Sequence, residues 1–320
     1  MNQINEIKVS VCVVTYNQEK YLAECLESLV QQETNFNFEI IVGEDCSTDG
    51  TRAIVKSYAE KYPHLVIPLL HENNVGALEN IKQVYLKARG KYIAHVDGDD
   101  AALPNKLQKQ FNALESNGGC TICSHNVLNI DGNSTQLNYQ NWKHDGGIYT
   151  LFDLFHRMPF FAHSSKMFRN NLSENDLNVF SNPEILDMDL HFVNLQHGNI
   201  VHLDENLGQY RMNVGMSNVG KKANPLLAKG AERIFEKGLE FYQNDSDKIK
   251  KLKSLYAYAM LQCAYNYAVY DQDPQLFKKY VNKSLDQKFI GVKQVIFKIA
   301  TYAPALFFKI FSLRSQLRNK

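Results

Sequence analysis

Three carboxylates, Asp97, Asp99 and Asp100, follow directly after a short apolar run at residues 92–96. Alternate residues of an extended segment point to the same side, so we expect Asp97 and Asp99 to face the same way. Two neighbouring carboxylates repel each other unless a cation lies between them. Oxygen ligands suit Mg²⁺ or Mn²⁺, which complete their coordination with phosphate oxygens and water. Asp97 and Asp99 are therefore predicted metal ligands, and Gly98 would let a diphosphate approach the backbone. The alternative is an acidic turn that caps the next helix, a role that suits Asp100.

A second polar loop, residues 44–51, lies between another apolar run and a helical pattern. An acidic side chain in such a loop can accept a hydrogen bond from a base or a ribose, and Asp45 is close to the end of the strand. Thr48 or Asp49 would instead cap the helix that follows. The loop is thus predicted to provide a ligand contact, through a free Asp45 side chain, and a helix cap.

The first apolar run of the chain ends in Thr15, Tyr16 and Asn17. A tyrosine at the edge of a ligand site offers a ring face on which a base can stack. Considered alone, such a tyrosine is more often a matter of ordinary packing. Asn17 is positioned to cap the helix that follows.

The N-terminal part of the chain alternates short apolar runs with helical periodicity, a pattern typical of βαβ units. The strands predicted in this way are residues 9–15, 38–43, 66–70 and 92–97. The helices predicted between them are residues 22–30, 54–62 and 78–88, the last of them ended by Gly90. Such crossovers give an α/β fold with a mostly parallel central sheet, whose loops gather at its carboxyl edge.

Taken together, the run at 9–17, the loop at 44–51 and the cluster at 97–100 resemble the family-two inverting glycosyltransferases of the GT-A fold. That family combines an apolar strand ending in Tyr-Asn, an Asp-Asp-Gly-Ser-like loop and an Asp-x-Asp motif. The resemblance covers about residues 8 to 215. It implies a Rossmann-like GT-A domain that binds nucleotide sugars, of the bacterial type that assembles polysaccharides and other glycans.

The resemblance also implies a role for each matching residue. Tyr16 would stack on the uracil of a UDP-sugar, and Asp45 would hydrogen-bond its imide. Asp97 would face the ribose and the metal, and Asp99 would coordinate the metal that bridges the diphosphate. Asp187 matches the general base at the head of a helix, where a helix N-cap is the alternative. The nucleotide-sugar contacts implied are Thr15, Tyr16, Asn17, Asp45, Asp97 and Gly98.

The sequence departs from the family pattern at several positions. Leu186 stands where the family has a glutamate before the base, and Asn213 stands where it often has a histidine that binds the metal. An arginine that the family carries after its Asn-x-Gly element is missing after residues 74–76. No Gln-x-x-Arg-Trp segment occurs, which argues against a processive polysaccharide synthase. His163 is a candidate contact for the acceptor, with a structural histidine as the alternative.

The implied activity is the metal-assisted transfer of a hexosyl or N-acetylhexosaminyl group, with inversion, from a nucleotide diphosphate donor to a hydroxyl group. A UDP-sugar is the expected donor, a glycan or a lipid-linked molecule the expected acceptor, and Mn²⁺ or Mg²⁺ the expected cofactor. A non-catalytic, donor-binding scaffold of a glycan assembly complex is one alternative, given Leu186 and Asn213. A sugar nucleotidyltransferase is another, but it should carry a glycine-rich basic loop after its first strand, where residues 16–20 are not of that kind.

Composition excludes several other classes. The chain has 35 Lys and Arg against 34 Asp and Glu, a formal charge of +1, so it has no field that would attract nucleic acid. Its cysteines lie mostly in apolar runs, which indicates a reducing compartment, and Cys120 and Cys123 are expected to be core thiols rather than zinc ligands. No signal peptide is recognised, and no stretch approaches the ~20 apolar residues of a spanning helix. A cytoplasmic location is therefore expected.

We expect three regions along the chain, namely a catalytic domain at 1–215, a linker at 216–225 and a helical region at 226–320 with a hairpin turn at 271–274. The end of the chain, about 288–320, carries apolar residues at helical spacing among basic ones, and Pro304 should kink or split its helix. Such a tail suits the anionic inner face of a cell membrane. Docking of the same apolar residues on the catalytic domain is the alternative.

Overall fold

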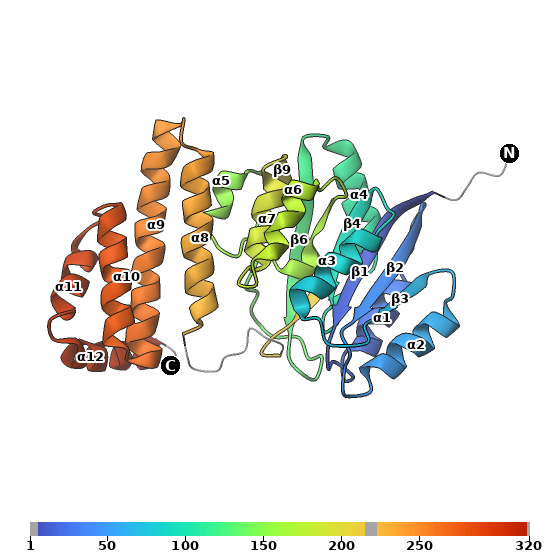
Figure 1. Ribbon diagram of the computed structural model, residues 1–320, viewed down its shortest axis with the longest axis horizontal. Coiled ribbons are helices and arrows are strands. Elements are labelled where there is room, and N and C mark those ends of the chain that lie inside the picture. Colours follow the sequence, from blue (N-terminus) through green and yellow to red (C-terminus); the bar gives the residue numbers. More distant parts are fainter. Residues whose placement is uncertain (1–5, 215–222, 319–320) are drawn as a thin grey trace. The chain divides into compact units, whose positions relative to one another are not determined.

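The computed structural model describes residues 6–214 and 223–318, without the side chains of residue 174 and residues 312–318. The chain forms two compact units (Figure 1). Unit 1 comprises residues 1–154 and 159–217, and unit 2 comprises residues 155–158 and 218–320. The linker expected at 216–225 lies mostly outside the described residues. The sequence did not indicate that the short segment 155–158 belongs with unit 2.

Unit 1 is built on one sheet of nine strands, in the order β3-β2-β1-β4-β8-β6-β9-β5, with β7 paired to β9. The strands are β1 (Ile7–Thr15), β2 (Asn37–Glu44), β3 (Val66–Leu70), β4 (Tyr92–Asp97), β5 (Ala101–Ala102), β6 (Cys120–Ile130), β7 (Gly147–Tyr149), β8 (Met167–Arg169) and β9 (Asn199–Arg211). β1 to β4 are parallel, as predicted, and so are β6 and β9, whereas β8, β5 and β7 run antiparallel to their neighbours. The predicted α/β fold class is confirmed.

The helices of unit 1 cover this sheet and connect its strands (Figure 1). They are α1 (Leu22–Val30), α2 (Thr51–Lys61), α3 (Ala77–Lys87), α4 (Lys106–Ser116), α5 (Leu151–Leu154), α6 (Glu174–Leu177) and α7 (Asp187–Leu195), with short 3₁₀ turns η1 (His163–Ser165) and η2 (Asn178–Ser181). The three helices predicted between β1 and β4 are all present, each within three residues of its predicted bounds.

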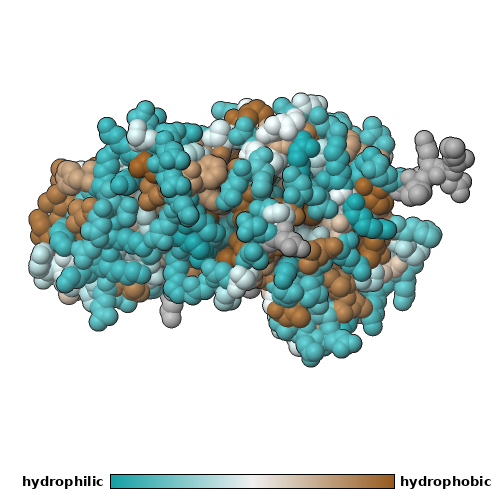
Figure 2. Space-filling view, turned by 45° about the horizontal axis from the view of Figure 1, so that its top comes forward, coloured by the Kyte–Doolittle hydropathy of each residue, from teal (hydrophilic) through white to brown (hydrophobic). Residues whose placement is uncertain are grey.

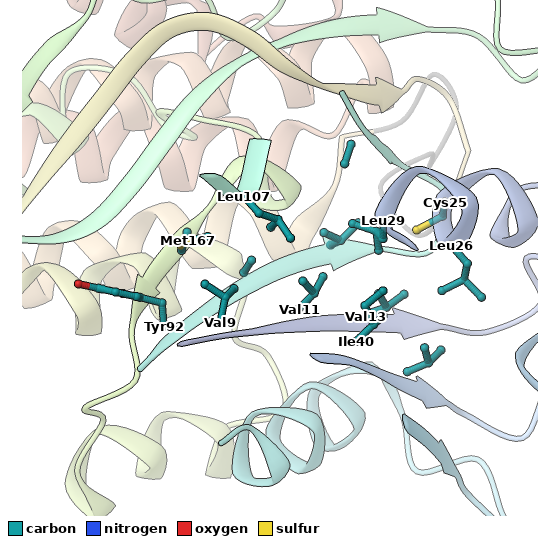
Figure 3. Packing of buried hydrophobic residues seen from close by; sticks show 14 of the residues in the cluster. Val9, Val11, Val13, Cys25, Leu26, Leu29, Ile40, Tyr92, Leu107 and Met167 are labelled. Carbon is teal, nitrogen blue, oxygen red and sulfur yellow. The ribbon is translucent and has the colours of Figure 1, made fainter. Parts of the chain in front are cut away.

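The core of unit 1 explains why β1 is a continuous apolar run. Val11 and Val13 are fully buried in one cluster with Leu26 and Leu29 of α1 (Figure 3). Cys12, on the opposite face of the strand, is buried as well. A strand covered on both faces carries no polar alternation. Each such side chain stabilises the fold by about 1.5–3 kcal/mol relative to an exposed position, and the packing fixes where the strand ends.

The parallel register brings the predicted polar loops to one edge of the sheet. Thr15 lies opposite Glu44 of β2, and Val14 lies opposite Asp97 of β4. The loops that leave β1, β2 and β4 therefore begin side by side. This is the carboxyl edge, where parallel α/β sheets bind their ligands.

The second half of unit 1 was only partly predicted. The strand expected at residues 120–127 is present as β6, and its Cys120 and Cys123 are buried free thiols, as predicted. The long strand β9 was not predicted from the sequence. It pairs with β6 along most of its length. The end of β9 also pairs with β5, which follows the acidic cluster directly. Tyr210 and Arg211 thereby lie beside residues 97–100.

Two residues predicted to cap or end a helix have other roles. Asn17 does not cap α1, whose N-cap is Tyr21; it adopts a left-handed conformation, φ 52°, and its Oδ1 accepts a hydrogen bond from Thr48 N at 2.8 Å. Gly90 does not end α3, because the helix ends at Lys87. A Cβ at Gly90 would lie 2.5 Å from the backbone nitrogen of Ser10, so the glycine is required by close approach to β1.

Unit 2 is helical. Its helices are α8 (Pro225–Phe241), α9 (Ser246–Asn266), a π-helical turn η3 (Tyr267–Asp271), α10 (Pro274–Gln287), α11 (Val292–Ala300) and α12 (Pro304–Arg318). The hairpin predicted at 271–274 is present between α9 and α10, with Asp273 accepting from the first N–H groups of α10. Pro304 separates α11 from α12, as predicted. In the parts of the chain that the structure describes, the helices are too short or too polar to cross a bilayer.

Candidate active site

Asp97 ends β4 and is held by two side chains. Its Oδ1 lies 3.1 Å from His95 Nε2, and its Oδ2 accepts a hydrogen bond from Ser164 Oγ at 3.2 Å. Burial opposes ionisation of this carboxyl, but the hydrogen bonds outweigh it and lower the pKa of Asp97. About a third of the side chain, 33%, stays exposed. Asp97 is thus an ionised carboxylate, fixed on one side and open on the other, which suits a cation or a ribose hydroxyl.

His95 is oriented in turn by Tyr85. The Tyr85 hydroxyl lies 3.0 Å from His95 Nδ1, and both residues are buried. Burial lowers the pKa of His95 and raises the pKa of Tyr85, so both are neutral. The only consistent arrangement has Tyr85 O–H donating to Nδ1 and Nε2–H donating to Asp97. Outer hydrogen bonds of this kind orient the carboxylates and histidines of metal sites. The sequence signal for this pair was a histidine inside an otherwise apolar strand.

Asp99 and Asp100 have different environments. Burial and the charge of Asp97 raise the pKa of Asp99 to about 6. Asp100 is only 2% exposed, and its Oδ1 accepts from the backbone N–H of Arg211 at 2.9 Å. The Arg211 guanidinium donates to the backbone oxygen of Asp99 at 2.8 Å. Asp100 therefore attaches β9 to the acidic loop, and it does not cap α4, whose N-cap is Asn105.

The loops after β1 and β2 are joined by reciprocal hydrogen bonds. Asn17 N–H donates to Ser47 Oγ at 3.0 Å, while Asn17 Oδ1 accepts from Thr48 N–H. The N-cap of α2 is Gly50, so neither Thr48 nor Asp49 is the predicted cap, although Asp49 Oδ1 accepts from the first N–H of the helix at 3.0 Å. Tyr16, between these attachments, is 46% exposed. Its ring is therefore held at the sheet edge and accessible to a planar ligand.

Asp45 is not free in the way the sequence suggested. Its N–H donates to the carbonyl of Thr15 at 3.1 Å, and both residues are buried. Its Oδ1 and Oδ2 accept from the backbone N–H groups of Val75 and Gly76 at 2.7 and 3.0 Å. The carboxylate thus holds the loop before α3, because two backbone donors would otherwise be unsatisfied.

Gly98 is required by contacts within the protein. A Cβ at this position would lie 2.5 Å from Gln18 Oε1 and 2.9 Å from Thr15 Cβ. The acidic loop therefore packs directly against the loop after β1. The contact of Gly98 with a diphosphate stays a prediction.

Asp187 is the first residue of α7, and the N-cap alternative for it is wrong. The N-cap is Leu186, and Asp189 accepts from the Leu186 N–H at 3.0 Å, so Asp189 makes the capping contact. Burial, followed by the charge of Asp97, raises the pKa of Asp187 to about 6. A partly buried carboxylate with a pKa near neutrality is suited to accept a proton.

Tyr210, near the end of β9, interacts electrostatically with the acidic residues described above. Burial raises the pKa of Tyr210, and the charges that raise it further are those of Asp100, Asp97, Asp99 and Asp187. The phenol is thus within electrostatic reach of carboxylates from two distant segments. Its ring meets Trp142 nearly edge-on, with centroids 4.7 Å apart.

Polar side chains buried behind the edge were not predicted as a group. His163 Nδ1 lies 3.1 Å from His191 Nε2 of α7, and its ring centroid is 3.9 Å from that of His95. His163 is buried, which favours the structural alternative, and its contact with an acceptor stays a prediction. Lys166 is fully buried, which lowers its pKa to about 7, against the opposing influence of Asp187 and Asp97.

Asp97 and Asp99 fit part of the coordination shell of a divalent cation. Within residues 6–214 and 223–318, no group of three or more His, Cys, Asp and Glu side chains forms a complete metal site. Two carboxylates leave the other positions of an octahedral ion to phosphate oxygens and water, the usual arrangement for Mg²⁺ with a phosphorylated ligand. Burial and then the charge of Asp97 raise the pKa of Asp99, and a bound cation would offset the repulsion between the two carboxylates.

Comparisons with known protein sequences identify relatives. The model of the family described as "Glycosyl transferase family 2" matches residues 10–176. An uncharacterized protein of Mycobacterium tuberculosis is 34% identical over 207 residues, which are 63% of this chain and 58% of that protein. The putative glycosyltransferase EpsE of Bacillus subtilis is 36% identical over 124 residues, 39% of this chain and 44% of EpsE. The chain thus spans about half the length of these relatives.

Solved structures share the fold. Residues 1–349 of Staphylococcus aureus TarS, in complex with UDP, give a TM-score of 0.66 at 18% identity, covering 98% of this chain and 92% of that one. The mannosyltransferase PcManGT from Pyrobaculum calidifontis, in complex with GDP-Man and Mn²⁺, gives 0.52 at 15% identity, covering 96% and 83%. At these identities the likeness concerns the fold alone.

Proposed function

Because the chain belongs to glycosyl transferase family 2, we propose that it transfers a sugar from a UDP-sugar to a hydroxyl group of a glycan or lipid-linked acceptor, with inversion at the anomeric carbon. The transferred group is a hexosyl or N-acetylhexosaminyl group. The observation that carries the proposal is the shared electrostatic environment of Asp97, Asp99 and Asp187 around Tyr210. This shared environment supports the proposal that two metal ligands and a base act on one bound donor.

The donor is proposed to bind along the edge formed by the loops after β1, β2 and β4. The exposed ring of Tyr16 supports stacking on the uracil. Asp45 would accept a hydrogen bond from the uracil imide while it still accepts from the N–H groups of residues 75 and 76. The loop before α3 would then form part of the base site. The UDP in the TarS structure and the GDP-Man in the PcManGT structure support a nucleotide diphosphate donor.

Asp97 and Asp99 are the residues proposed to hold Mn²⁺ or Mg²⁺, a choice supported by the Mn²⁺ in the PcManGT structure. When bound, the ion would supply Lewis acidity to the departing diphosphate. His95 and Tyr85 would keep Asp97 ionised and correctly oriented beforehand.

Asp187 is proposed to take the proton of the acceptor hydroxyl. The acceptor oxygen then forms its bond to the anomeric carbon while the bond to the diphosphate breaks on the opposite face, which inverts the configuration. With a pKa of about 6, Asp187 is mostly ionised at neutral pH and yet basic enough to share a proton in the transition state. The proton of the acceptor hydroxyl is then on Asp187, and the negative charge is on the released nucleotide diphosphate.

Release of UDP from a panel of UDP-sugars, with and without Mn²⁺, tests the proposal. We expect release that needs the metal and rises when a hydroxyl acceptor is added. Binding of a UDP-sugar without release in the presence of any acceptor would favour the non-catalytic scaffold. Formation of a UDP-sugar from UTP and a sugar phosphate would favour a nucleotidyltransferase.

The proposal extends to the organisation and location of the chain. The catalytic domain would be residues 1–215, joined by a linker at 216–225 to the helical region 226–320. The protein would act in the cytoplasm, at the inner face of the cell membrane, where residues 288–320 would contact anionic lipid and a lipid-linked acceptor would be within reach. No nucleic acid partner is proposed.

His95→Phe is expected to raise the Mn²⁺ concentration for half-maximal activity by roughly tenfold or more, because Asp97 loses the hydrogen bond that orients it. His95→Gln, which keeps a donor, should restore most of the affinity. Both variants should bind UDP without metal as the parent does. An unchanged Mn²⁺ requirement in a folded His95→Phe protein would show that His95 does not position the ligand.

A further inference from the structure

Exposed apolar side chains are concentrated at one end of unit 2. Eighteen large hydrophobic residues are exposed among those described, and eight of them lie between positions 289 and 310. The eight are Phe289, Val292, Val295, Ile296, Ile299, Tyr302, Leu306 and Ile310; we call them the apolar face. Figure 2 shows hydrophobic surface, in brown, over the part of unit 2 where α11 lies in Figure 1. Clustering of this kind indicates an interaction surface.

The apolar face is not needed for the packing of unit 2. α11 packs inward through Phe297 and Ala300, which are buried, and Phe297 contacts Phe277 of α10 and Phe311 of α12 with ring centroids 5.8 and 5.0 Å apart. The outward residues of α11 lie at positions 292, 295, 296 and 299. This is the spacing of a single stripe on a helix, opposite to the buried one. α11 is therefore apolar on both sides. Its packing within unit 2 explains the buried side but not the exposed one.

Positive charge borders the apolar face. Among residues 287–320 there is no Asp or Glu, whereas Lys288, Lys293, Lys298 and Lys309 accompany the exposed residues. At about 100° per residue, Lys293 and Lys298 fall on opposite flanks of the outward stripe of α11. Lys298 donates to Asn282 Oδ1 at 2.7 Å, a neutral partner that leaves its charge uncompensated.

We propose that the apolar face of α11, the following turn and α12 lies on the surface of an anionic bilayer, with its apolar side chains in the interface and its lysines at the headgroups. An apolar stripe with basic flanks is the pattern of helices that lie in the membrane plane. A second copy of the chain fits less well, because a two-fold contact through this face would bring like-charged lysines together. The inference names the side chains behind the membrane contact proposed above for residues 288–320, and it does not depend on which donor the protein uses.

Vesicle co-sedimentation of the full chain tests this surface. The parent should pellet with vesicles of phosphatidylcholine and phosphatidylglycerol, much less with phosphatidylcholine alone, and less as salt is raised. The combined variant Val292→Asn, Ile299→Asn and Leu306→Asn should bind roughly tenfold less or weaker still. These side chains are exposed, so circular dichroism and thermal unfolding should match the parent.

The matched control replaces three equally exposed apolar residues elsewhere, Leu86→Asn, Leu227→Asn and Tyr258→Asn, and should bind vesicles as the parent does. Equal binding by both triple variants would overturn the proposal. A second result would also overturn it. In that case neither the parent nor the first variant binds vesicles, and analytical ultracentrifugation shows a concentration-dependent dimer of the parent that the first variant does not form. Vesicle binding without any UDP-sugar turnover would support the membrane-binding surface and refute the proposed glycosyl transfer.

Discussion

Replacing Asp99 by alanine is expected to abolish measurable transfer and to remove the effect of Mn²⁺ on donor binding. Asp99 is one of only two carboxylates proposed to hold the ion, and its pKa is raised by burial and then by the neighbouring charge of Asp97. Loss of stabilisation of the leaving diphosphate should lower turnover by roughly 10²-fold or more. The measurements are the rate of UDP release and the titration of UDP-sugar by calorimetry with and without Mn²⁺.

Asp100→Asn is the matched control for Asp99→Ala. It replaces the carboxyl group one residue away by an amide but keeps the oxygen that accepts from Arg211 N–H. We expect this variant to keep its metal dependence and measurable activity. If Asp100→Asn lost activity and metal-dependent binding as completely as Asp99→Ala, at unchanged thermal stability, the metal would have been assigned to the wrong carboxylates.

Asp187→Asn is expected to leave UDP-sugar affinity nearly unchanged while turnover falls by roughly 10²-fold or more, the scale of losing a general base. The amide keeps the shape of the side chain and the acceptor oxygen for Met188 N–H, which lies 2.9 Å from Asp187 Oδ1. Binding and chemistry should therefore separate. Turnover is measured at saturating donor and affinity by calorimetry; an unchanged turnover would exclude Asp187 as the base.

The pH dependence gives an independent check on the same residue. The pKa of Asp187 is raised to about 6, so the reactive carboxylate is lost as pH falls through 6 and is fully present well above it. Turnover of the parent should rise with pH across this range and then level off. The residual turnover of Asp187→Asn should lack that rise. A similar rise in the variant would assign the titration to another group.

The parts of the site that follow from local sequence could be predicted. Apolar runs located β1 to β4, and because parallel strands share a carboxyl edge, the positions of Tyr16 and Asp97 followed from the strands alone. Asp187 could not be placed in this way. It is far along the chain and only its resemblance to a family motif identified it, whereas its proximity to Asp97 depends on β6, β8 and β9, whose mixed pairing has no simple periodicity.

The errors share one physical cause, which is competition from partners distant in sequence. Asn17 was expected to satisfy the helix next to it, but the N–H of Thr48, 31 residues away, takes its oxygen. Asp45 was expected to be free, but two backbone donors of the loop before α3 occupy it. The pairing of Tyr85 with His95 was not predicted either, because a histidine inside an apolar strand does not show which residue it contacts.

The position of Trp142 provides an optical reporter for this site. It is the only tryptophan among the 320 residues, and its ring meets that of Tyr210, whose pKa is raised by burial and by the charges of all four carboxylates. The tryptophan emission of the chain therefore comes from one fluorophore beside Tyr210. Arrival of a cation, a nucleotide or an acceptor there should alter that emission without any label, so ligands can be screened on variants that no longer turn over.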